Sequence, residues 1–202
     1  IESMQFYESD ASRGFLRGSK WLLQPTTGPL RTVGRWTHGE AVCDEPFWGG
    51  QFTVKMSQSV GHMIQWLVMS EDLPEESNHV TLDPMLKDSD GLPAPKVHYK
   101  TSENTKRLVA FNLDRSIESH MAAGAHKAWV TSRNVPPGHL LGTARCGHDP
   151  ATSVVNAFGQ SHDVPNLFLI DGSVFVTSTG TNPTSTICAF ARRTALHIAA
   201  NR

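Results

Sequence analysis

The alternation of apolar and polar positions in the middle of the chain predicts strands. Residues 62–70 form an apolar-rich run that suits a buried strand or a short helix leading into one. Residues 79–83 and 96–100 alternate apolar and polar, and a connection rich in Pro, Asp and Gly separates them. A further strand is expected at 127–131. Together these patterns favour an antiparallel sheet.

One long helix is predicted between the strands expected at 96–100 and 127–131. Ser102 is a suitable cap at its start, and Gly124 follows its end at the position where a helix commonly stops. The apolar positions recur every four residues, at Val109, Leu113, Ile117 and Met121. Strands with one long helix among them predict an α+β fold, with an antiparallel sheet and helices on one face.

The first 50 residues are rich in Gly, Pro, Thr and Trp. The segment W-L-L-Q-P-T-T-G-P-L at 21–30 predicts turns and short irregular pieces. The aromatic residues of this region could pack or line a pocket, and we favour packing for Trp21, Trp36, Phe47 and Trp48.

The C-terminal region combines an apolar run with a well-marked helix start. Residues 166–170 predict a strand buried on both faces, and Asp171, Gly172 and Ser173 end it. A helical pattern follows, with Asn182 as the expected N-cap and Pro183 as the first helical residue. A helix N-terminus carries partial positive charge, which favours an anionic group nearby.

Charge and cysteine content exclude several classes of protein. The 18 Lys and Arg balance 19 Asp and Glu, so neither nucleic acid nor an anionic membrane is an expected partner. The three cysteines lack C-x-x-C spacing, which argues against a disulfide framework or a zinc site and favours a reducing cytoplasm. The sequence contains no run of about 18 apolar residues, so it predicts no membrane-spanning helix. The acidic run that begins at Glu71 and Asp72 predicts a solvated turn.

Three motifs carry a family resemblance. H-L-L-G-T begins at His139, V-P-N-L-F-L-I-D-G-S contains Asp171, and T-N-P-T contains Asn182. In this order they resemble the C-terminal signature of the glucose-methanol-choline (GMC) flavoprotein oxidoreductases, and the Asn-Pro-Thr version is similar to the pyranose oxidase branch. Cys146 replaces a usual Met, and Thr179 and Thr181 replace small or apolar residues.

The resemblance implies an FAD-dependent oxidation of a sugar, polyol or other alcohol. It places His139 and Asn182 together over the flavin as the catalytic pair, with His139 as the base that takes the hydroxyl proton while a hydride leaves for flavin N5. It further implies that FAD is bound by Asp171 and Gly172 beside the ribityl and pyrophosphate, and by Asn182, Pro183 and Thr184 at the helix end.

The resemblance also implies a division of the chain. Residues 1–50 would lie near the substrate entrance, 51–138 would form the substrate domain, and 139–202 would supply the strand and helix that complete an FAD-binding α/β domain. No G-x-G-x-x-G follows a strand, and the chain opens at Ile1. We therefore expect a C-terminal portion, with the N-terminal FAD-binding portion as a missing segment or a separate chain.

Two alternatives remain at this point. Some GMC proteins use the same fold and histidine for cyanohydrin cleavage, so a hydroxynitrile lyase is one. A non-catalytic structural subunit without its own FAD is the other, because the glycine loop is absent.

Overall fold

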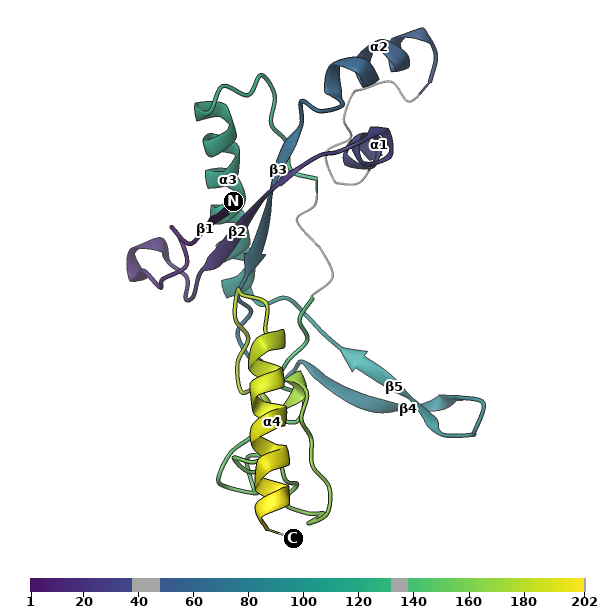
Figure 1. The fold of residues 1–202 in the computed structure, drawn as a ribbon, viewed down its shortest axis with the longest axis vertical. Helices are drawn as coiled ribbons and strands as arrows, with labels where there is room; N and C mark the ends of the chain where they lie inside the picture. Colours follow the sequence, from purple (N-terminus) through teal and green to yellow (C-terminus); the bar gives the residue numbers. More distant parts are fainter. Residues whose placement is uncertain (38–47, 132–137, 202) are drawn as a thin grey trace. The chain divides into compact units, whose positions relative to one another are not determined.

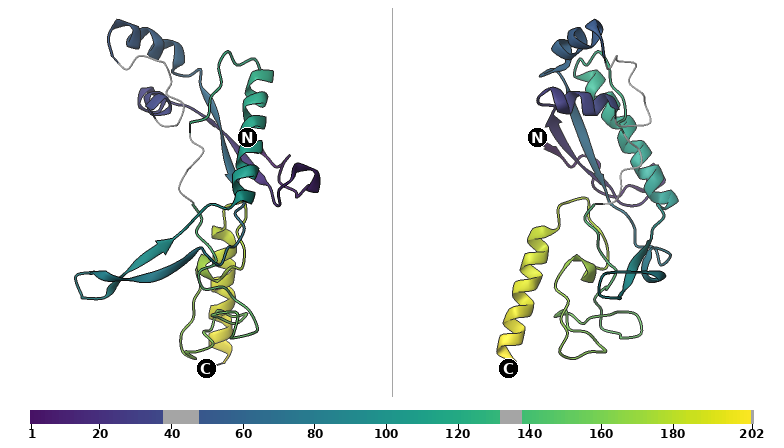
Figure 2. Two further views of the ribbon diagram at one scale, coloured as in Figure 1. Left: turned by 180° about the vertical axis from the view of Figure 1, so that it is seen from behind. Right: turned by 90° about the vertical axis from the view of Figure 1, so that its right-hand side faces the viewer.

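The chain folds into two compact units, each made of two separate stretches of sequence (Figures 1 and 2). The computed structural model describes residues 1–37, 48–131 and 138–201. Unit 1 comprises Ile1–Ser70 and Asn104–Pro136, and unit 2 comprises Glu71–Glu103 and Pro137–Arg202.

Unit 1 contains a three-stranded antiparallel sheet in the order β1-β2-β3. Its strands are β1 (Glu2–Ser3), β2 (Ser19–Pro25) and β3 (Ile64–Ser70). The strand expected at 62–70 is confirmed as β3. The turns expected from residue 21 are wrong, because β2 is the central strand and its backbone pairs with both neighbours. Tertiary pairing here outweighs the Pro- and Gly-rich composition around it.

The long helix α3 (Glu103–Ala122) covers one face of this sheet (Figure 2). Trp21 Nε1 donates a 2.8 Å hydrogen bond to Oδ1 of Asn112, which is fully buried. Trp66 Nε1 donates to Ser119 Oγ at 3.3 Å, about two turns further along the helix. The predicted helix over 102–123 and its packing on an antiparallel sheet are confirmed, and Gly124 has the left-handed φ of +90° expected after the helix end.

Three shorter helices complete the regular structure of unit 1 in the described ranges. They are η1 (Ala11–Arg13), α1 (Pro29–Thr37) and α2 (Gly50–Ser59). The strand expected at 127–131 is wrong: that stretch is irregular, because its backbone forms no ladder with another strand of the described residues. Over the described parts of both units, no helix is long and apolar enough to cross a membrane.

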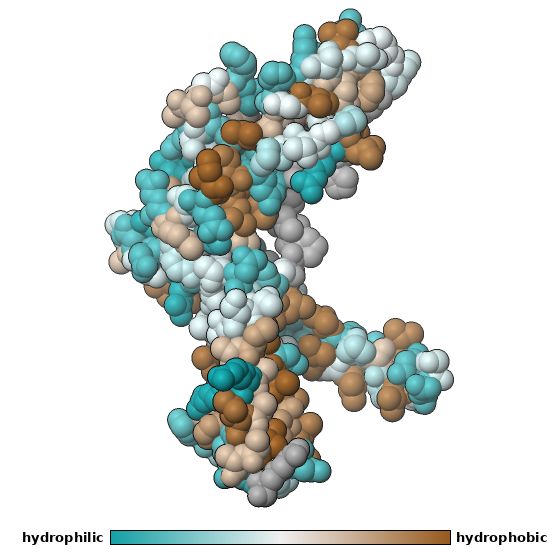
Figure 3. All heavy atoms as spheres, viewed as in Figure 1, coloured by the Kyte–Doolittle hydropathy of each residue, from teal (hydrophilic) through white to brown (hydrophobic). Residues whose placement is uncertain are grey.

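Unit 2 begins with the hairpin β4 (His79–Lys87) and β5 (Pro93–His98). Both expected strands are confirmed, and His79 pairs with His98 across the hairpin. The expectation that they join the sheet of β3 is wrong, since in the described chain they pair only with each other. The local turn at 88–91 closes the hairpin, and Figure 3 shows apolar side chains on its surface. Leu82 and Val97 are among its exposed apolar residues.

Residues 138–176 form a loop-rich body that leads through η2 (Gly172–Val174) to helix α4 (Thr184–Ala200). The strand expected at 166–170 is wrong, because only Phe168 makes a single bridge, to Gln160. Leu167 and Ile170 are each 44% exposed rather than buried. A strand of this kind lies inside a sheet, with a hydrogen-bonded strand on each side and packing against both faces. In the described chain, residues 166–170 have only the loop around Gln160 beside them.

Gly18 allows the closest backbone approach in the described part of unit 1. A Cβ at this position would come within 1.9 Å of the Tyr7 carbonyl oxygen. We predict that Gly18→Ala destabilises the protein by about 1 to 3 kcal/mol, because the Tyr7 backbone must move aside. Gly34→Ala is the control: its Cβ meets nothing within 4 Å inside α1, so it should be neutral or slightly stabilising. Equal melting temperatures for the two variants would contradict this.

His120 makes the stability of unit 1 depend on pH. Burial against Trp66 holds the pKa of His120 below its ordinary value, because it disfavours the charged ring. The unfolded chain therefore binds the proton more readily, and the stability present above about pH 6.5 declines as the pH falls below that value. We predict that His120→Phe, which keeps a ring but does not titrate, flattens the melting temperature between about pH 7 and 5 relative to wild type. Parallel curves would exclude His120 as a source of the dependence.

Candidate active site

His139 and Asn182 meet side by side, although 43 positions separate them. Asn182 Nδ2 and His139 Nε2 are 3.2 Å apart, and both residues are exposed. The amide nitrogen can only donate, so in this pairing His139 Nε2 acts as the acceptor and Nδ1 carries the ring proton. The expected proximity of the two motifs is confirmed, and the ring nitrogen that accepts the hydrogen bond faces Asn182.

The backbone around His139 is fixed by the segment that contains Asp171. Gly142, Ala144 and Cys146 donate in turn to the carbonyls of residues 172, 173 and 174, at 3.3, 2.9 and 2.8 Å. His139 itself has a φ of +55°, a left-handed conformation that few residues other than glycine adopt. The H-x-x-G-T and D-G-S segments thus lie against each other through main-chain bonds.

Gly172 and Asp171 each have a structural task at this junction. A Cβ on Gly172 would come within 2.6 Å of the Leu141 side chain, so only glycine fits there without a shift. The Asp171 carboxylate caps η2 by accepting from the Ser173 N–H at 2.8 Å. Hydrogen bonds from the Ser173 hydroxyl and N–H lower the pKa of Asp171. Both residues therefore shape the segment that holds 142–146.

Helix α4 starts one residue later than expected. Pro183, at φ −86° and ψ −4°, is the N-cap residue and Thr184 the first helical residue. The expectation that Asn182 caps the helix is wrong, because its amide instead lies against His139. No described side chain caps α4, so the N–H groups of its first turn keep the partial positive charge of the helix end close to Asn182.

The loop at 178–181 is anchored by residues that sequence reasoning missed. The Gly180 N–H donates to Glu71 Oε1 at 3.4 Å, and Ser178 bonds to the backbone of Asp72. The expected solvated turn is wrong for Glu71, which is only 6% exposed. Nothing in the local sequence distinguishes Glu71 from its exposed acidic neighbours, because its partner lies 109 positions away.

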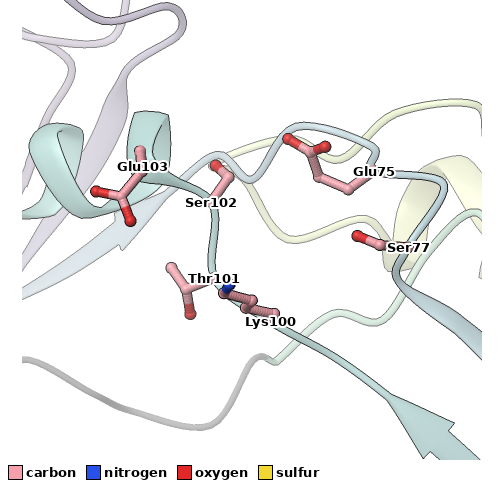
Figure 4. A pocket seen from close by; sticks show the side chains of 6 residues that line it. All are labelled: Glu75, Ser77, Lys100, Thr101, Ser102 and Glu103. Carbon is pink, nitrogen blue, oxygen red and sulfur yellow. The ribbon is translucent and has the colours of Figure 1, made fainter.

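A separate hollow of about 260 Å³ lies in unit 2 between the segment before β4 and the segment after β5 (Figure 4). It is lined by polar side chains that are exposed or half-exposed. Ligand pockets usually have apolar walls and a few buried polar groups. The hollow carries none of the predicted site residues, since its lining is Glu75, Ser77, Lys100, Thr101, Ser102 and Glu103.

Metal-ligating side chains do not gather in the described parts of the chain. No group of three or more His, Cys, Asp or Glu residues there could hold a metal ion. Cys146 is half-buried and Cys188 exposed, and both are free thiols. Cys43 and Phe47 lie outside the described residues. The chemistry available at the site is therefore that of an imidazole, an amide and a helix end.

Comparison with known proteins gives this geometry a context. The family model described as GMC oxidoreductase matches residues 74–191. The chain is 40% identical over 195 residues to 2-methyl-1,2-propanediol dehydrogenase of Mycolicibacterium austroafricanum, covering 96% of this chain and 35% of that protein. It is 30% identical over 147 residues to the fructose dehydrogenase large subunit of Gluconobacter japonicus, covering 73% and 27%.

A third relative is 6'''-hydroxyparomomycin C oxidase of Streptomyces lividus, 39% identical over 137 residues that cover 65% of this chain and 25% of the relative. The chain thus spans about a quarter to a third of the length of these relatives. The family match covers more than half of this chain and includes both His139 and Asn182. The chain belongs to the GMC oxidoreductase family.

Proposed function

We propose that this chain is part of an FAD-dependent oxidoreductase that oxidises an alcohol group of a sugar, polyol or other alcohol. The observation that carries the proposal is the His139–Asn182 pair, 3.2 Å apart at the start of α4. The names of the relatives, which are dehydrogenases and oxidases of a diol, of fructose and of a paromomycin derivative, favour oxidation over cyanohydrin cleavage.

The residues present fit one end of FAD. The N-terminus of α4 offers backbone N–H groups from Thr184 onward to an anionic ring edge, and the exposed Asn182 amide adds a polar contact. Pro183, at the N-cap, has no N–H of its own and sets the direction in which the helix starts. Asp171 and Gly172 are proposed to lie beside the ribityl and pyrophosphate. When bound, FAD would accept the hydride that leaves the alcohol carbon.

His139 is proposed to take the proton of the substrate hydroxyl at Nε2. The lone pair of that nitrogen is directed at the Asn182 amide. The two side chains can therefore contact the same small polar group of a substrate. A substrate hydroxyl that replaces the hydrogen bond between the two side chains would donate to His139 Nε2 and accept from the Asn182 amide, so that its proton is aligned with the base. A positioned base of this kind typically contributes about 10² to 10⁴ to the rate.

We also propose a division of labour along the chain. Residues 139–202 would complete the FAD-binding domain, and 51–138 would contribute to the substrate domain, with 1–50 near the substrate entrance. The chain contains no G-x-G-x-x-G loop. The groups that bind the adenosine and pyrophosphate would then come from an N-terminal portion of the same protein or from a partner chain.

We predict that His139→Ala, in the FAD-loaded protein that contains this chain, slows flavin reduction by an alcohol substrate roughly 10² to 10⁴-fold. The measurement is anaerobic single-turnover bleaching of the flavin. His148→Ala is the control, because His148 is also exposed and belongs to no predicted site. An unchanged rate in His139→Ala would remove His139 as the base, and cyanide release from a cyanohydrin without flavin reduction would select the lyase.

We predict that Asn182→Ala slows the same step while leaving the melting temperature close to wild type. Loss of a true N-cap costs about 1 kcal/mol of stability, but the Asn182 side chain makes no cap hydrogen bond here. Asn166→Ala, at another exposed asparagine, is the matched control. A clear loss of thermal stability together with a normal reduction rate would reverse the assignment and make Asn182 a structural residue.

A further inference from the structure

The loop that leads into Asn182 is fastened to the chain directly after β3. We call the contacts of Glu71 and Asp72 with Ser178 and Gly180 the 71–180 clasp. Asp72 N–H donates to Ser178 Oγ at 3.0 Å, and Ser178 Oγ–H donates back to the Asp72 carbonyl at 2.5 Å. The Gly180 N–H donates to Glu71 Oε1 at 3.4 Å. These hydrogen bonds join two segments more than 100 positions apart.

The burial of Glu71 shows that the clasp is more than a surface contact. Its side chain is only 6% exposed, and Gly180 is buried as well. A buried carboxylate is costly unless hydrogen bonds compensate it, and a buried N–H without an acceptor is costly too. The Glu71 carboxylate therefore supplies an acceptor for the buried Gly180 N–H. Glu76, a little further along the chain, is exposed.

A second anchor joins the clasp to the hairpin end. The Tyr99 hydroxyl donates to Asp72 Oδ2 at 2.7 Å. Burial raises the pKa of Tyr99, and the Asp72 carboxylate adds to this shift. The hydroxyl accordingly stays protonated as a donor at neutral pH. Its hydrogen bond to Asp72 helps to fix the backbone of Asp72, to which Ser178 is bonded.

The clasped loop transmits its position to the catalytic pair because it is short and internally bonded. Thr179 Oγ1 and Thr181 Oγ1 are 2.6 Å apart, and the Thr181 N–H donates to Thr179 Oγ1 at 2.8 Å. A shift of Gly180 must then carry the nearby Asn182 with it. Asn182 in turn lies 3.2 Å from His139.

We propose that Glu71 and Ser178 are positioning residues, which hold the 178–181 loop so that the Asn182 amide lies against His139 in the reactive arrangement. This inference rests on the proposed function of that pair. In the described part of the chain neither residue hydrogen-bonds to His139 or Asn182, so each acts through the loop. Misplacing a substrate-orienting group by about 1 Å can cost about 10²-fold in rate.

The test uses the FAD-loaded protein and a double-mutant cycle between Glu71 and Asn182. Glu71→Ala alone should lower the anaerobic flavin-reduction rate about 10 to 100-fold. In the Asn182→Ala background the same change should alter the rate less than about twofold, because there is no amide left to position. Melting temperatures are recorded for all four proteins, and Glu76→Ala serves as the control at an exposed glutamate.

Glu71→Gln and Ser178→Ala complete the experiment. Glutamine keeps an oxygen that can accept from Gly180, so Glu71→Gln should stay within about threefold of wild type. Ser178→Ala should slow reduction and, like Glu71→Ala, lose its effect in the Asn182→Ala background. Should Glu71→Ala fail to fold, the Ser178→Ala and Glu71→Gln proteins still test the positioning role.

The outcomes separate this inference from the function it rests on. If Asn182→Ala alone reduces flavin at the normal rate, the proposed role of the pair fails. Suppose instead that Asn182→Ala is slow while Glu71→Ala and Ser178→Ala lower the rate by the same factor in the Asn182→Ala background as in wild type. In that case the clasp is a structural element only and the inference is overturned. Loss of stability in every background with no coupling in rate overturns it as well.

Discussion

The main-chain bonds between 142–146 and 172–174 are the constraint on which unit 2 depends. They join the H-x-x-G-T segment to the D-G-S segment, and the close approach at Gly172 lets Leu141 pack against it. A short ladder of this kind needs no particular side chains apart from the glycine. It brings the chain around His139 to the segment that continues into α4, so the proximity of His139 to Asn182 follows from backbone geometry.

Unit 1 depends on a different kind of contact. The indole of Trp21 and the fully buried Asn112 bond across the interface between β2 and α3, and Asn112 also donates to the Leu108 carbonyl within its own helix. A buried amide is tolerated when its groups are satisfied, and it then favours one register of helix on sheet over its neighbours. The aromatic residues around it, including Phe6 and Phe111, fill the remaining space.

Periodicity in the sequence was sufficient where an element depends on its own residues. The four-residue repeat from Val109 to Met121 marks α3, and alternation marks the two strands of the hairpin. It was insufficient where an element depends on distant partners. Residues 21–25 become a strand because β1 and β3 flank them, and 166–170 stay out of a sheet because they have one loop neighbour in the described chain.

The same distinction applies to the candidate site. The family resemblance carried by the three motifs was enough to predict that His139 and Asn182 meet, and main-chain bonds between 142–146 and 172–174 bring their segments near each other. It could not reveal Glu71, whose role is set by burial and by a partner 109 positions away.

The two halves of the pair are therefore held by different means, and this bears on how each can vary. His139 has a left-handed backbone conformation, which costs about 1 to 2 kcal/mol for a residue with a side chain, and the segment that follows it is held by main-chain bonds from 142–146. Apart from a change at Gly172, side-chain substitutions in this segment remove none of the donors and acceptors of the main-chain bonds between 142–146 and 172–174. The loop before Asn182 is held through hydroxyl and carboxylate groups at Ser178, Thr179 and Glu71, each of which a single substitution removes. Substitutions in the 178–181 loop can therefore shift the position of the Asn182 amide, while the position of the His139 backbone stays fixed.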